Sequence, residues 1–178
     1  PQPLFYLCGI MGWNYFSECL GRSSGTFISN AGVFSKVYFP RLVVPISGTV
    51  SSLVKFAIQL LLFLIVYAYY SWEGVNIQAN EYLLLFPVLI AMLAGLGFGF
   101  GVIISSMTTK YRDLALFFSF FTQLWMYATP IIYPLSTMSK KYMWLIELNP
   151  LTSIIEAMKY GFMGAGTFSW YSLSYSFV

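Results

Sequence analysis

Four long apolar runs dominate the sequence and restrict what the chain can fold into. They cover residues 4–20, 42–70, 82–109 and 114–133, and the charged side chains inside them are Glu18 and Lys55. A helix needs about 20 apolar residues to cross a bilayer core about 30 Å thick, and a charge at the centre of that core costs on the order of 3 kcal/mol. Because only 8% of the residues are charged, a water-facing surface could not be covered. The sequence therefore predicts an all-α integral membrane bundle.

The two ends of the sequence predict that the chain is an interior fragment of a multi-pass protein. Residues 168–178 begin another apolar run that stops at about half the length of a span. Residues 1–3 lead directly into an apolar run without a charged leader segment. The runs lack the alternation of apolar and polar residues that membrane strands need. We therefore expect a single helical transmembrane domain over residues 1–178.

Several classes of function lack the residues that they require. The chain has no histidine and its acidic residues are scattered, whereas metal sites and acid–base catalysis need clustered ligands or paired groups. The net charge of +3 is too thinly spread for a nucleic-acid surface. No phosphate loop of the form G-x-x-x-x-G-K-[ST] occurs. If ATP drives this protein, another chain or region hydrolyses it, and we expect no catalytic residue, metal or cofactor in this chain.

Basic residues in short loops predict the orientation of the chain across the membrane. Five bases lie in residues 21–41 and in the link before residue 114, whereas residues 71–81 contain none. If the spans alternate, the two basic links share one side, which we place inside. The 71–81 and 135–167 connections then lie outside, where three lysines oppose the five inner bases without outweighing them.

The outer segment 135–167 predicts two short helices instead of a plain loop. Asn149 and Pro150 suit the N-cap and the first position of a helix. After them, apolar residues recur at helical spacing on one face, while Glu156 and Lys159 fall on the other face. A similar helix is expected just upstream. Both are too short to span, so they either dip into the membrane and return or lie flat on it.

Four glycines at alternate positions in the third apolar run predict close helix packing. Gly95 with Gly99, and Gly97 with Gly101, form two overlapping small-xxx-small pairs that let a second helix approach. The same glycines, followed by Asp113, superficially resemble a dinucleotide fingerprint. That fingerprint needs a strand before it and a helix that starts at the glycines, and these glycines lie in mid-span.

Two groups of side chains are candidates for lining a translocation path. Lys55 and Gln59 belong to a stripe of polar residues that recur every four positions on one helical face. Such a stripe either faces other helices or a watery path, or it packs while the lysine reaches the headgroups. Phe121 and Trp125 lie four apart in an aromatic-rich run. Their rings either offer faces on which sugars slide or form an interfacial belt.

Four short motifs follow one another along the chain. They are Ser35-Lys36-Val37-Tyr38-Phe39-Pro40-Arg41-Leu42 with Pro45, Lys110-Tyr111-Arg112-Asp113-Leu114, Thr129-Pro130-Ile131-Ile132-Tyr133-Pro134-Leu135, and Leu148-Asn149-Pro150-Leu151. In this order they resemble the permease subunits of bacterial exporters of O-antigen, capsular polysaccharide and teichoic acid, which are type-2 ABC transporters. The resemblance covers essentially the whole chain.

The resemblance implies a bundle of six spans per subunit, of which the present spans are the second to fifth and the start of the sixth. It also implies a homodimer around one path and separate ATPase subunits inside, which bind ATP and magnesium. Two short outer helices would form a gate at residues 135–167, and a short inner helix at residues 31–41 would couple the subunit to the ATPase.

The candidate site residues fall into three groups. Those for ATPase coupling are Phe34, Lys36, Tyr38, Phe39 and Arg41, with Lys110, Arg112 and Asp113 as a second contact. Those for the translocation path are Lys55, Gln59, Phe121 and Trp125, and those for the outer gate are Tyr133, Pro134, Asn149 and Pro150. The aromatic residues of the inner loop would supply apolar anchors, and its basic residues would pair with carboxylates at the rim of the contact.

The function implied is export of a lipid-linked polysaccharide through the bacterial cytoplasmic membrane. Two alternatives remain. An exporter of drugs or small lipids would share the fold. A membrane enzyme that modifies glycans is disfavoured by the missing histidine and by the lack of paired carboxylates.

Overall fold

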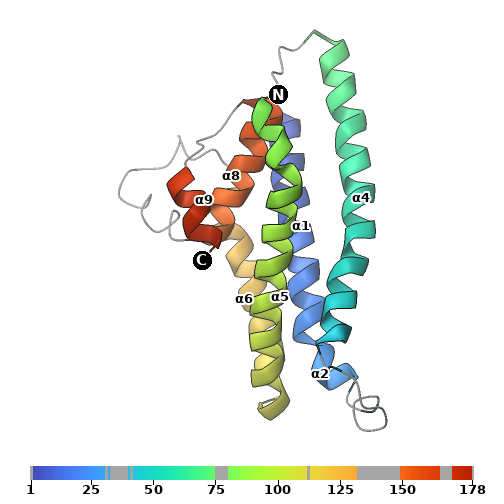
Figure 1. Cartoon of the computed structure of the whole chain (residues 1–178), viewed down its shortest axis with the longest axis vertical. Helices are drawn as coiled ribbons and strands as arrows, with labels where there is room; N and C mark the ends of the chain where they lie inside the picture. The colour runs from blue at the N-terminus through green and yellow to red at the C-terminus, as the bar shows by residue number, and fades with distance from the viewer. Residues whose placement is uncertain are drawn as a thin grey trace.

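The computed structural model is a bundle of α-helices, which confirms the predicted fold class (Figure 1). It describes residues 2–30, 32, 40, 42–74, 80–111, 113–131, 149–164 and 170–177, and these ranges contain no β-strand. The helices are α1 (Gln2–Ser24), α2 (Thr26–Ser29), α4 (Val43–Trp72), the 3-10 helix η1 (Glu81–Leu85), α5 (Phe86–Lys110), α6 (Leu114–Ala128), α8 (Pro150–Met163) and α9 (Trp170–Phe177).

The three longest helices run side by side along the long axis and alternate in direction (Figure 1). Helix α1 contacts both α4 and α5, and α6 returns beside the lower part of α5. Helices α8 and α9 lie beside the upper part of the bundle, at the same end as the start of α1 and of α5. The other end carries α2 and the link between α5 and α6, which belong to the two predicted inner connections.

Close contact between α1 and α5 depends on two of the four glycines. A Cβ atom on Gly97 would lie 2.8 Å from the Cβ of Cys19, and one on Gly101 would collide with the Cβ of Ser23. Added Cβ atoms on Gly95 and Gly99 would meet no atom of the described residues within 4 Å. One of the two predicted glycine pairs therefore packs against a helix of this chain, and the other faces open space.

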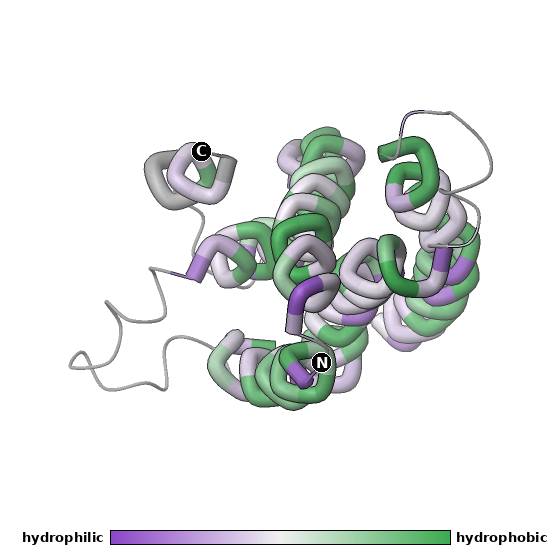
Figure 2. Tube along the Cα trace, turned by 90° about the horizontal axis from the view of Figure 1, so that it is seen from below, coloured by the Kyte–Doolittle hydropathy of each residue, from purple (hydrophilic) through white to green (hydrophobic). Residues whose placement is uncertain are grey.

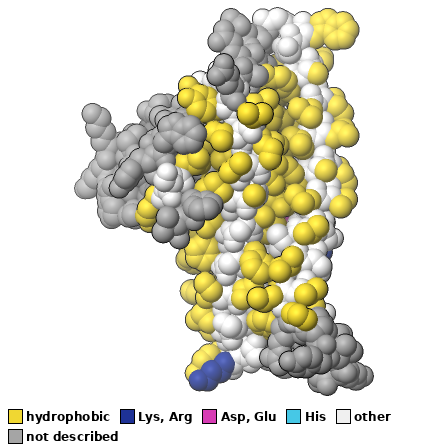
Figure 3. All heavy atoms as spheres, viewed as in Figure 1, with side chains coloured by type: hydrophobic (Ala, Val, Ile, Leu, Met, Phe, Trp, Pro, Cys, Tyr) yellow, Lys and Arg dark blue, Asp and Glu magenta, His cyan; other side chains and the backbone are white. Residues whose placement is uncertain are grey.

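The outer surface of the bundle is apolar. Apolar residues occupy outward-facing as well as inward-facing turns in the end-on view (Figure 2), and hydrophobic side chains cover much of the face drawn in Figure 3. Two helical stretches, Val43–Trp72 and Tyr82–Lys110, are long and apolar enough to cross a membrane, and only 17% of the most apolar window of each is buried. An apolar surface of this extent suits a bilayer. Helix α1 is not among the helices that are long and apolar enough to span. It lies at the centre of the bundle and carries a larger share of polar residues than α4 or α5.

The last predicted span is shorter as a helix than expected. Residues 114–133 were expected to be one span, but α6 ends at Ala128. Thr129 is extended, with φ −96° and ψ 135°, because a following proline disfavours helical backbone in the residue before it. The chain therefore leaves the helix at Thr129 and Pro130, close to the start of α8.

Helix α8 begins as predicted but packs differently. Asn149 is its N-cap, its side chain accepts a hydrogen bond from the amide of Leu151, and Gly164 ends the helix with a positive φ of 63°. Glu156 and Lys159, which the sequence places on the face opposite the apolar residues, are both buried, with exposed fractions of 2% and 0%. Helix α1, η1 and α9 cover α8, and the two charges pair with each other at 3.2 Å.

Candidate functional site: a polar groove along α1

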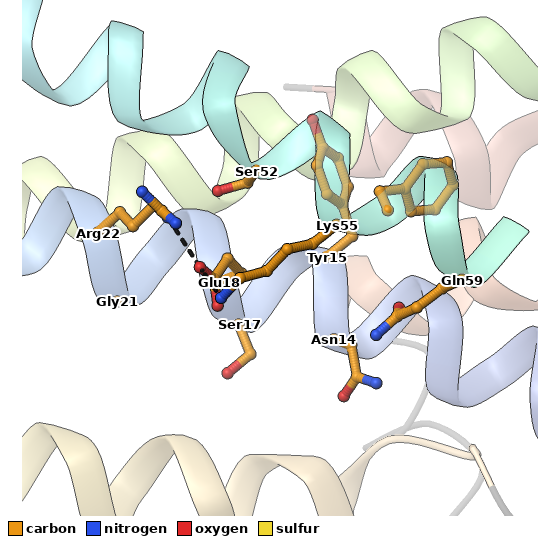
Figure 4. A pocket seen from close by; sticks show the side chains of 10 residues that line it. Asn14, Tyr15, Ser17, Glu18, Gly21, Arg22, Ser52, Lys55 and Gln59 are labelled. Carbon is orange, nitrogen blue, oxygen red and sulfur yellow. Dashed lines mark hydrogen bonds and ion pairs between the residues drawn. The ribbon is translucent and has the colours of Figure 1, made fainter.

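A groove with a cavity of about 470 Å³ separates part of α1 from α4 (Figure 4). Asn14, Ser17, Glu18 and Gly21 recur at spacings of three and four residues, which places them on one face of α1; we call them the α1 polar face. The groove is lined by this face, by Tyr15 and Arg22 of α1, and by Ser52, Lys55, Phe56 and Gln59 of α4. Both path candidates from the polar stripe, Lys55 and Gln59, therefore lie in the groove.

Three charged side chains meet in this groove. The Glu18 oxygen Oε1 accepts a hydrogen bond from Arg22 Nε at 2.8 Å and another from Lys55 Nζ at 2.7 Å. The side chains of Arg22 and Lys55 are 38% and 62% exposed, and that of Glu18 is 29% exposed. Two positive charges and one negative charge leave the cluster with a net charge of +1. The lysine thus reaches across to α1.

A second hollow lies on the other side of the α1 polar face. Its volume is about 280 Å³, and it is bounded by α1, α2, α5 and α6. Ser17 and Gly21 line both hollows, and Ser119 and Thr122 face the second one from α6. The α1 polar face is therefore flanked by α4 on one side and by α6 on the other, in a strip of hydroxyl, amide and charged groups.

Aromatic rings extend along α6, and no side chain of this helix is fully buried. The rings of Phe117 and Phe121 stack with centroids 6.2 Å apart and an interplanar angle of 19°. Phe121 also contacts Trp125, with centroids 5.8 Å apart. Trp125 itself packs edge-on against Phe16 and Phe100, each at 5.5 Å. The two path candidates of this helix, Phe121 and Trp125, therefore contact each other. Phe121 is 46% exposed, whereas Trp125 helps to join α6 to the bundle.

The end of α6 is held by α8 through two polar contacts. The Asn149 side-chain amide donates to Thr129 Oγ1 at 3.0 Å, so two of the sequence motifs meet here. The Lys159 ammonium donates to the carbonyl oxygen of Pro130 at 2.6 Å and lies 3.8 Å from the ring centroid of Phe5 in α1. This one side chain connects α8, α1 and the segment after α6.

Two candidate coupling residues lie at the opposite end of the bundle. Lys110 is the last residue of α5, with its ammonium 5.4 Å from the ring centroid of Tyr111. Asp113 precedes α6 and makes no capping hydrogen bond with its side chain. The remaining candidates lie outside the described residues; they are Phe34, Lys36, Tyr38, Phe39, Arg41, Arg112, Tyr133 and Pro134.

Sequence reasoning missed several residues of these sites, among them Glu18, Thr129 and Lys159. Glu18 stands four residues before Arg22, a spacing that signals a local ion pair, but its partner Lys55 lies 37 residues away. Thr129 and Lys159 carried no signal for their contacts, because helical periodicity does not tell which faces of a short helix other segments cover.

A helical bundle with an apolar exterior and a charged, hydroxyl-rich strip between helices is typical of an integral membrane protein. Comparison with known families gives the particular class: residues 2–163 match the family described as ABC-2 type transporter. The chain belongs to this family.

Three curated relatives carry the name "O-antigen export system permease protein RfbA". One from Klebsiella pneumoniae is 30% identical over 176 residues, which cover 97% of this chain and 65% of the relative. A second from Klebsiella pneumoniae is 30% identical over 178 residues, covering 96% and 64%. The third, from Myxococcus xanthus, is 30% identical over 156 residues, covering 86% and 58%. The chain thus spans 58–65% of the length of these relatives.

Proposed function

We propose that this chain forms the channel part of a multi-pass subunit that exports a lipid-linked polysaccharide across the bacterial cytoplasmic membrane. The observation that carries this proposal is the similarity to three proteins named as O-antigen export permeases, over 86–97% of the chain. The family membership supports transport. The substrate class comes from the names of the relatives, and a capsule or teichoic-acid substrate remains within the same proposal.

The described surface supports a path along the α1 polar face. A glycan passing a membrane needs partners for its hydroxyl groups and flat apolar faces for its rings. Asn14 and Ser17 offer the first, and the exposed, stacked rings of Phe117 and Phe121 offer the second. Side chains from α1, α4 and α6 would form one wall, and a second copy of the subunit would supply the facing wall.

Energy would come from a separate ATPase subunit at the end that carries α2 and the α5–α6 link. Lys110 and Asp113 are exposed there, and residues 31–41, which we propose as the coupling segment, follow α2. Aromatic anchors such as Tyr38 and Phe39 would bind a groove of the ATPase. ATP and magnesium would be bound by that partner and not by this chain.

The outer end would act as the gate. Helix α8 lies beside α1 and α5 within the height of the bundle (Figure 1), which supports a helix that dips into the membrane over one that lies flat on it. Asn149 and Lys159 tie it to the end of α6. A movement of α6 would therefore be transmitted to α8.

Reconstituted transport tests the proposal. The full-length protein that contains this chain, together with its ATPase subunit, is placed in liposomes and supplied with a labelled lipid-linked glycan or with a labelled drug. We expect ATP-dependent movement of the glycan and none of the drug, with a hydrolysis-deficient ATPase as the control. Movement of the drug alone would favour the alternative that this protein exports drugs or small lipids. A modified glycan formed without any ATPase would favour the membrane enzyme.

The orientation is tested separately with single cysteines. We propose that Ser139 is reachable from outside and Ser35 from inside. A membrane-impermeant thiol reagent on intact cells should therefore label Ser139→Cys and not Ser35→Cys. The reverse pattern would overturn the orientation.

A further inference from the structure

The charge cluster in the groove between α1 and α4 carries an inference about the ligand. Glu18 is shared by two cations, and both donate to the same oxygen, Oε1. The cluster keeps a net charge of +1 in a groove of about 470 Å³. Since a net positive charge next to a bilayer core is costly, the groove is suited to an anion.

We propose that Arg22 and Lys55 bind the phosphate group of a lipid-linked molecule in this groove. The inference rests on the proposed function, because it names the part of the exported molecule that this groove would recognise. Among the described residues, the two terminal guanidinium nitrogens of Arg22 have no partner, since its hydrogen bond to Glu18 uses Nε. That free edge is the planar fork that suits phosphate oxygens.

The surface of α4 next to the groove also indicates how the ligand would lie. Lys55, Ile58 and Leu62 are spaced three and four residues apart, so they lie on the same side of α4. Ile58 and Leu62 are 65% and 52% exposed, and they lie next to the groove without lining it. The helix therefore changes from polar to apolar within two turns above the lysine. A phosphate at Lys55 could therefore continue into an acyl or prenyl chain along the lipid-facing surface of α4.

Glu18 would act as an internal competitor for the phosphate. Its carboxylate occupies the space between the two cations (Figure 4). A phosphate that carries a larger charge and more acceptor oxygens would take over their donors, and the carboxylate would turn away. This arrangement predicts that removing a positive charge weakens phosphate binding and that removing the negative charge strengthens it.

The test measures binding of a fluorescent polyprenyl phosphate to the full-length protein in nanodiscs, without the ATPase. Lys55→Gln and Arg22→Gln should each weaken binding about tenfold, since each removes a charge-assisted hydrogen bond. Glu18→Gln should strengthen binding by a similar factor. Glu73→Gln is the matched control, because it makes the same change at the other end of α4, and it should leave binding unchanged. Thermal unfolding of each variant confirms that it is folded.

Two further probes separate the sources of phosphate. Inorganic phosphate that competes as well as the lipid at equal concentration would overturn the assignment to a lipid-linked group. Phosphatidylglycerol that competes equally would show a general phospholipid site and would also overturn the link to the exported molecule. If Glu18→Gln weakens binding as much as Lys55→Gln, the cluster is a structural ion pair and the inference is wrong. Glycan export is measured separately and does not depend on that result. A failure of the phosphate site can therefore be distinguished from a failure of the proposed function.

Discussion

Removing the ammonium of Lys159 is expected to destabilise the bundle strongly. The side chain has no exposed surface, donates to the Pro130 carbonyl oxygen at 2.6 Å and pairs with Glu156 at 3.2 Å. Lys159→Met keeps much of the volume but leaves a buried carboxylate without its cation and a carbonyl without its donor. Breaking a buried ion pair in this way costs about 3–5 kcal/mol.

A second substitution tests the physical reason. In the double variant Lys159→Met, Glu156→Gln, the charge left behind is neutralised, and the principal loss is the donor to Pro130, which costs about 1–3 kcal/mol. The double variant should therefore be more stable than Lys159→Met alone. The matched control is Lys110→Met, at the exposed end of α5, which should change stability by less than about 0.5 kcal/mol.

The assay is thermal unfolding of the full-length protein in detergent, followed by tryptophan fluorescence. We expect the wild type and Lys110→Met to unfold at the highest temperature, the double variant at a lower temperature and Lys159→Met at the lowest. If Lys159→Met unfolds at the same temperature as the wild type, or if the double variant is the least stable, the buried pair does not stabilise the contact between α8, α1 and the end of α6.

Three further changes test the coupling segment, the path and the α1–α5 contact. Tyr38→Ala should leave the subunit inserted but reduce co-purification of the ATPase and abolish export. Normal assembly and export would show that the contact lies elsewhere, with residues 110–113 as the next candidate. Phe121→Ala should lower glycan export per folded molecule, and unchanged export would assign the exposed ring to lipid. Gly101→Ala should destabilise the bundle by about 1–3 kcal/mol through overpacking, as read from thermal unfolding. Gly99→Ala, which adds a methyl group in open space, should not; equal effects would contradict the asymmetric contact.

The helices could be predicted from the sequence because their signals are local. Long apolar runs give helices in a bilayer whatever their neighbours are, so the predicted runs correspond to α1, α4, α5 and α6. The start of α8 at Asn149 and Pro150 was also predicted, since an N-cap and a first-turn proline act within a few residues. The early end of α6 at Ala128 had a local cause too, namely Pro130, and its signal was present in the sequence.

Contacts between helices could not be predicted in the same way. Periodicity places Glu156 and Lys159 on one face of α8, but only the packing of other segments decides that this face is covered. The two glycine pairs of α5 are equivalent in sequence, yet only Gly97 and Gly101 turn toward α1. The partner of Lys55 depends on the axial offset between α1 and α4, which no local pattern records.

The two ion-pair clusters differ in how easily their contacts can separate. In a membrane, helices are held together by packing and polar contacts, because lipid removes most of the hydrophobic drive. The pair at Lys159 is buried, so separating α8 from the end of α6 leaves uncompensated groups. The pair between Glu18 and Lys55 is partly exposed, and exposed ion pairs are worth about 0–1 kcal/mol. Polar groups also line the groove beside it, so they can replace the lost contact. Of these two contacts, the one between α1 and α4 at Glu18 and Lys55 is therefore the contact that a ligand or a bound partner can open at the lower cost.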